Sequence, residues 1–60
     1  MEIRYDADLK VWEVTGKDGQ KFVVVPEWNY DIVGPAGELV HRPWTLEAAL
    51  HYLRGRFREI

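Results

Sequence analysis

The absence of cysteine from a chain of 60 residues is the feature that most restricts its fold. A domain this small buries only about 60% of the surface that its unfolded chain exposes. It therefore usually needs disulfides, a metal, an oligomer or large aromatic side chains. Without cysteine, disulfides and thiolate metal sites are excluded. Three tryptophans, three tyrosines and two phenylalanines remain to build the core of one domain over residues 1–60.

Residues 2–42 show the pattern of short strands separated by turns. Met1, Ile3 and Tyr5 alternate with charged residues, as in a strand with one buried face. Asp18-Gly19 lies between two apolar runs and predicts a tight hairpin whose turn needs a positive φ. The sequence thus predicts an antiparallel meander of four to five short strands. We expect these strands over residues 1–5, 9–14, 21–26, 30–33 and 38–41.

The last quarter of the chain predicts one amphipathic helix from residue 46 to about 58. Its apolar residues recur three or four positions apart, as on one face of a helix. Thr45 is a good N-cap, and Trp44 stands where a hydrophobic staple would begin. Gly55 leaves open whether the helix continues or ends near Arg54. We expect an α+β fold with this C-terminal helix packed on one sheet face. The apolar residues are Leu46, Ala49, Leu50, Leu53, Phe57 and Ile60.

The aromatic residues lead to the first functional hypothesis. One helix can cover only one sheet face, so we expect some aromatic side chains on the other face. An exposed apolar patch on a small protein often marks a protein interface, where tryptophan and tyrosine are favoured. We therefore expect a small binding or regulatory module that acts through protein–protein contact and self-association, most simply as a homodimer. The expected interface residues are Trp12, Trp28 and Tyr30.

The uneven charge supports a second hypothesis, a nucleic-acid-binding domain that uses the basic C-terminal helix. The net charge is −2, yet residues 42–60 carry four arginines against two carboxylates. A net negative charge disfavours sequence-independent binding of nucleic acid, because such binding needs a positive electrostatic potential. Cations near a helix C-terminus also complement its dipole without binding anything. The candidate contacts are Arg42, Arg54, Arg56 and Arg58.

The sequence gives little support to catalysis, a metal site or a cofactor. Serine and cysteine are both absent, and no glycine-rich loop opens a helix after a strand. His41 and His51 lie ten residues apart on different predicted elements and lack metalloprotease spacing. We therefore expect a non-enzyme with no catalytic residues, no metal ligands and no cofactor.

Composition also bears on the cell compartment and the source. No apolar run reaches the roughly 18 residues of a membrane span, and charged residues interrupt the N-terminus where a signal peptide would be apolar. We expect a cytoplasmic protein with no membrane partner. Scarce asparagine, glutamine and methionine are typical of a thermophile, although a GC-rich genome or an engineered sequence gives the same pattern.

Residues 30–53, YDIVGPAGELVHRPWTLEAALHYL, resemble the strand–turn–strand–helix ending of two groups of small domains. One is the arm-type DNA-binding domain of phage integrases, a three-stranded sheet with a helix. The other is the HicB-type antitoxins, in which a similar helix start follows a sheet. The integrase-like sheet is usually basic, whereas Asp31 and Glu38 make this hairpin acidic. The resemblance assigns no functional residue to this chain.

Overall fold

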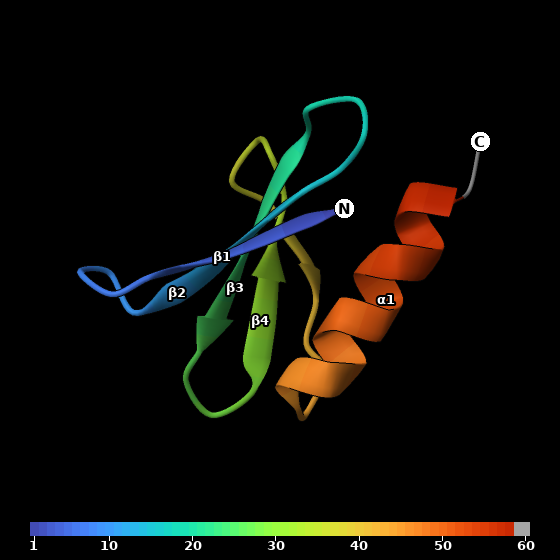
Figure 1. Cartoon of the computed structure of the whole chain (residues 1–60). Helices are drawn as coiled ribbons and strands as arrows, with labels where there is room; N and C mark the ends of the chain where they lie inside the picture. Colours follow the sequence, from blue (N-terminus) through green and yellow to red (C-terminus); the bar gives the residue numbers. More distant parts are fainter. Residues whose placement is uncertain (59–60) are drawn as a thin grey trace.

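The computed structural model, which describes residues 1–58, shows a five-stranded antiparallel sheet with one helix against one of its faces (Figure 1). The strands follow each other in the sheet in chain order, so each pairs with its neighbours in sequence. The predicted α+β meander is therefore confirmed, with the larger of the two expected numbers of strands. The elements are β1 (Glu2–Asp6), β2 (Val11–Thr15), β3 (Lys21–Pro26), β4 (Tyr30–Val33), β5 (Leu39–His41) and α1 (Leu46–Arg58).

The hairpin between β2 and β3 contains the tight turn that Asp18-Gly19 predicts. Gly19 does adopt the expected positive φ, 84°. Thr15 and Lys21 are the last paired residues of the two strands. The Gly19 amide donates to the Gly16 carbonyl at 3.1 Å, which closes a four-residue β-turn over residues 16–19. The Gly16 amide also donates to the Gln20 carbonyl at 2.9 Å, so the loop itself consists of residues 17–19. The ring of Phe57 packs on Gly16, where a side chain would collide with it.

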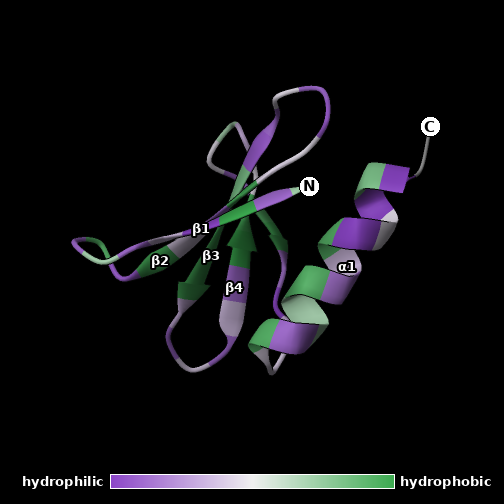
Figure 2. Cartoon of the chain, in the orientation of Figure 1, coloured by the Kyte–Doolittle hydropathy of each residue, from purple (hydrophilic) through white to green (hydrophobic). Residues whose placement is uncertain are grey.

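The core lies between α1 and the face of the sheet that it covers. Trp12 and Val14 of β2 point to this face, because they pair with the buried Val24 and Phe22. The sheet contributes four fully buried side chains and α1 contributes two, so the core is small. Hydrophobic residues along β3 and in α1 can be followed in Figure 2. The buried set is Val14, Phe22, Val24, Ile32, Ala49 and Leu53.

Helix α1 begins and ends where the sequence predicts. The Ala48 amide donates to the Thr45 hydroxyl at 3.0 Å, which confirms the N-cap. The helix continues through Gly55 to Arg58, so the continuous alternative is the right one. It packs on β3 and β4 and is too narrow to cover all five strands. Part of the covered face therefore remains open toward β1.

Replacing Gly55 by alanine should stabilise the protein. Gly55 is exposed in the helix, and an added Cβ would meet no atom within 4 Å. Alanine is favoured over glycine in a helix interior by about 1 kcal/mol, which in a domain of this size raises Tm by roughly 4–8 °C. Thermal unfolding followed by circular dichroism measures the change. Gly19→Ala is the matched control and should lower Tm, because residue 19 needs a positive φ.

Candidate protein-interaction surface

Two tryptophans lie almost entirely in solvent. Trp28, in the turn between β3 and β4, is 94% exposed, and Trp44, between β5 and α1, is 79% exposed. The exposure of Trp44 is incompatible with the buried hydrophobic staple that its sequence position indicates. Both the β3–β4 turn and the start of α1 lie at the lower end of the molecule in Figure 1. We call Trp28 and Trp44 the tryptophan end.

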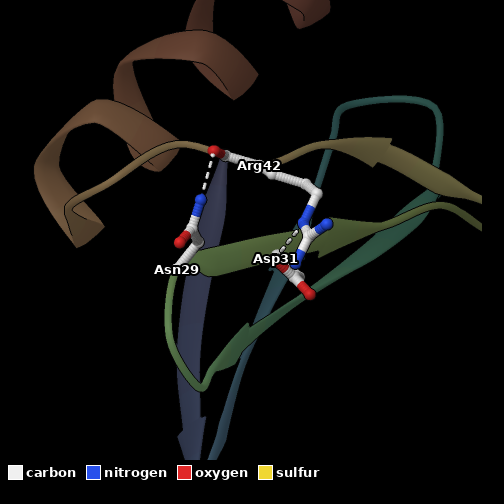
Figure 3. A network of polar contacts seen from close by, with 3 residues as sticks. All are labelled: Asn29, Asp31 and Arg42. Carbon is white, nitrogen blue, oxygen red and sulfur yellow. Dashed lines mark hydrogen bonds and ion pairs between the residues drawn. The ribbon is translucent and has the colours of Figure 1, made fainter.

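Polar contacts hold the two segments of the tryptophan end together. The Asn29 side-chain amide donates to the Arg42 carbonyl at 3.1 Å, as Figure 3 shows. The Tyr30 amide donates to the carbonyl of the buried Pro43 at 2.8 Å. Arg42 also makes an ion pair with Asp31, with Nε 3.1 Å from Oδ1 (Figure 3). Each exposed tryptophan therefore adjoins, in sequence, a residue that ties the two segments to each other.

A second apolar surface lies where α1 leaves its face of the sheet uncovered. Tyr5 of β1 pairs with Trp12 of β2, and their ring centroids are 4.8 Å apart. Trp12 is half-buried, whereas Tyr5 is 47% exposed. Met1 and Ile3 are exposed as well. This uncovered surface borders the free edge of β1.

The three predicted interface residues occupy different positions. Trp12 and Tyr30 lie on the helix side of the sheet, separated by β3, and Trp28 lies in a turn. None of the three therefore lies on the sheet face opposite α1, where the sequence predicts exposed aromatic side chains. The uncovered aromatic surface lies instead on the helix side, because α1 covers only part of that face. Sequence reasoning missed Trp44, Tyr5 and Ile3. The alternation of residues 1–5 was the available signal for the last two.

The four predicted nucleic-acid contacts do not form one surface. Arg42 precedes α1 and is paired with Asp31, whereas the other three belong to its last turns. A rise of about 1.5 Å per residue separates these two ends of the helix by roughly 15–20 Å. The Arg56 guanidinium lies 5.3 Å from the centroid of the Phe22 ring. Only Arg54 and Arg58, four positions apart and exposed, share one side of α1.

The two histidines have different surroundings. The ring of His41 stacks on Tyr52, with centroids 4.5 Å apart, and so joins β5 to α1. His51 is exposed. Across residues 1–58, no three histidine, aspartate or glutamate side chains gather in a group that could hold a metal ion. Within the same range, α1 is neither long nor apolar enough to span a bilayer.

No protein-family model matches this chain, and no curated protein or solved structure matches it. The resemblance of residues 30–53 to integrase arm-binding domains and HicB-type antitoxins gains no support from these comparisons. The five-stranded sheet also differs from the three-stranded sheet of the integrase domain. We therefore infer the function from the surface of this structure.

Proposed function

We propose that this protein is a small non-catalytic binding module that acts through protein–protein contact and self-association. The observation that supports it is the exposure of Trp28 and Trp44 on segments tied together by hydrogen bonds. Tryptophan is enriched among the residues that dominate binding energy at protein interfaces. A fixed backbone also lowers the entropy that binding would otherwise lose. The tryptophan end is thus prepared for a partner with an apolar pocket.

The charges near the tryptophan end favour a protein partner over a nucleic acid. Glu27 adjoins Trp28 in sequence, and Asp31 already neutralises Arg42 nearby. Aromatic platforms for single-stranded nucleic acids combine stacking residues with a positively charged groove. Here the carboxylate of Glu27 would repel phosphates. An apolar centre with polar surroundings is the usual anatomy of a protein interface.

Trp28→Ala should abolish partner contact while leaving the fold intact. Because Trp28 is 94% exposed, we expect the free energy of unfolding to change by less than about 0.5 kcal/mol. The contact itself is measured by placing a photo-crosslinking amino acid at the exposed position 27, beside Trp28, in the full chain with and without Trp28→Ala. The control position is Ala36, which is exposed in the β4–β5 turn at the opposite end of β4. Protein adducts are expected at 27 but not at 36, and Trp28→Ala should remove them. Equal adducts at both positions, or adducts that Trp28→Ala leaves unchanged, would contradict the proposal.

The alternative function is nucleic-acid binding through α1, and the exposed pair Arg54 and Arg58 is the observation that favours it. Anisotropy of labelled duplex and single-stranded probes, at low and near-physiological salt, tests this alternative. Two neutralised phosphates would give a slope of only about −1.4 to −1.8 in log K against log[salt]. Binding that disappears in the Arg54→Gln/Arg58→Gln variant would replace the protein-contact proposal as the leading function.

A further inference from the structure

The two edges of the sheet differ in how well they are protected. Unpaired backbone groups along an edge strand can pair with another chain, and proteins block this with short strands, bulges, prolines or lysines. At one edge, β5 spans only Leu39–His41, its pairing with β4 is irregular at Ile32/Val33, and Pro43 follows it. At the other edge, β1 spans Glu2–Asp6 in unbroken register with β2 and contains neither proline nor lysine.

We propose that β1 pairs antiparallel with β1 of a second copy of this chain, about a twofold axis at Ile3. The two sheets would then join edge to edge into one continuous antiparallel sheet. This inference rests on the self-association part of the proposed function and names its surface. The tryptophan end plays no part in it and stays available to another protein.

The charges along β1 are complementary to themselves in this register. Residues directly opposite each other in an antiparallel pair lie on the same sheet face. With Ile3 on the axis, Glu2 lies opposite the partner's Arg4, and Arg4 lies opposite the partner's Glu2. Symmetry thus creates two opposite-charge pairs from a single strand. On the helix side, Ile3 meets the partner's Ile3 and Met1 meets the partner's Tyr5.

Neighbouring twofold registers are less favourable. With Arg4 on the axis, the two arginines oppose each other, and Glu2 opposes the partner's Asp6. Like charges directly opposite each other destabilise a sheet. With Tyr5 on the axis, Arg4 opposes the partner's Asp6, but Glu2 opposes the partner's Asp8, which carries the same charge and lies in the turn beyond β1. Of these three registers, only the one centred on Ile3 gives opposite-charge pairs without any like-charge pair.

The exposed apolar residues of β1 give the pairing its second source of stability. Met1 is 42% exposed, Ile3 38% and Tyr5 47%, and all three lie on the helix side of the sheet, at the β1 edge that α1 does not cover. In the monomer these side chains face water. In the paired sheet each lies opposite an apolar residue of the partner, so contact with solvent decreases.

A charge-swap experiment tests both the pairing and its register. The wild-type chain should show a concentration-dependent monomer–dimer equilibrium in sedimentation equilibrium. Glu2→Arg and Arg4→Glu each replace two attractive pairs by two repulsive ones, so each should weaken the dimer at least about tenfold. An equimolar mixture of the two variants restores both opposite-charge pairs and should dimerise again as a heterodimer. A wild-type chain that stays monomeric at every concentration would overturn the proposal.

The mixture also separates dimerisation from folding. Arg4 lies opposite Glu13 within the chain, so Arg4→Glu also weakens the pairing of β1 with β2. A folding defect in one variant cannot be repaired by adding the other unless the two chains contact each other. Lys17→Glu, in the exposed β2–β3 turn, has the same charge change as Arg4→Glu and should leave the dimer intact. Failure of the mixture to dimerise would reject the Ile3 register.

A single-cysteine experiment locates the contact independently of charge. The chain has no cysteine of its own, so one introduced thiol can only join two copies. Opposite Cα atoms in antiparallel strands are about 4.5–5.5 Å apart, which a disulfide can span. Ile3→Cys should therefore form a covalent dimer on mild oxidation, whereas the more exposed Leu39→Cys on β5 should not. Equal yields would overturn the β1 contact without affecting the Trp28 experiment.

Discussion

Phe22→Ala should leave the chain largely unfolded at 25 °C. Phe22 is 1% exposed at the centre of the core, and its ring meets Phe57 edge to face with centroids 5.5 Å apart. Removing a buried phenylalanine ring costs about 3–5 kcal/mol. The core of a domain this small rarely supplies more than about 3–5 kcal/mol. The loss is therefore comparable with the whole free energy of unfolding.

Val23→Ala is the control for this substitution. Val23 is the next residue of β3, so its side chain points to the open face of the sheet, and it is only half-buried. We expect a loss of about 1 kcal/mol and a chain that remains folded. Urea unfolding followed by far-ultraviolet circular dichroism compares the two variants. Equal losses would contradict a core confined to the helix side of the sheet.

The elements of this fold are predictable because local chemistry specifies them. Proline at position 43 and threonine at 45 fix the start of α1, and its apolar spacing fixes the buried side. The strands follow from short apolar runs between turn residues. The bounds of β3 and β4 agree with the predicted bounds, because Pro26 and Gly34 stand at their ends. In these segments local propensity and tertiary packing favour the same structure.

The candidate surface is less predictable from the sequence, because it depends on how many strands of the sheet α1 covers. Alternation assigns Trp12 to the same face as Val14, but it does not show that α1 packs mainly on β3 and β4 and leaves this face uncovered toward β1. That limit decides which aromatic side chains remain open. Trp44 illustrates the same point, since its position next to an N-cap indicates burial while the structure leaves it in solvent.

The partners of the arginine side chains are also hard to predict from the sequence. Arg42 and Asp31 are eleven residues apart, and the order of the strands brings them together. Arg56 reaches Phe22 from the opposite half of the chain. The sequence gives the number of arginines near the C-terminus, but only tertiary structure shows that two of the four already have partners. This distribution is why we place protein contact ahead of nucleic-acid binding.

Leu53→Ala should cost about 2–5 kcal/mol, the second largest effect that we expect. Leu53 is 0% exposed and is one of only two α1 side chains that the sheet buries completely. Its loss removes the larger of the two α1 side chains that are fully buried in the core. In a domain of this size we expect the helix to detach and the chain to unfold in one transition. Thermal and urea unfolding measure the loss.

Leu50→Ala is the matched control, because it makes the same change in helix propensity on the same helix. Leu50 is half-buried and lies on the same side of α1 as Phe57, seven residues further on. We expect a clearly smaller loss, about half that of Leu53→Ala. The comparison also bears on self-association. An equal loss would show that α1 buries its β2-facing side as fully as its centre, which would leave less apolar surface near β1 for a second copy to cover.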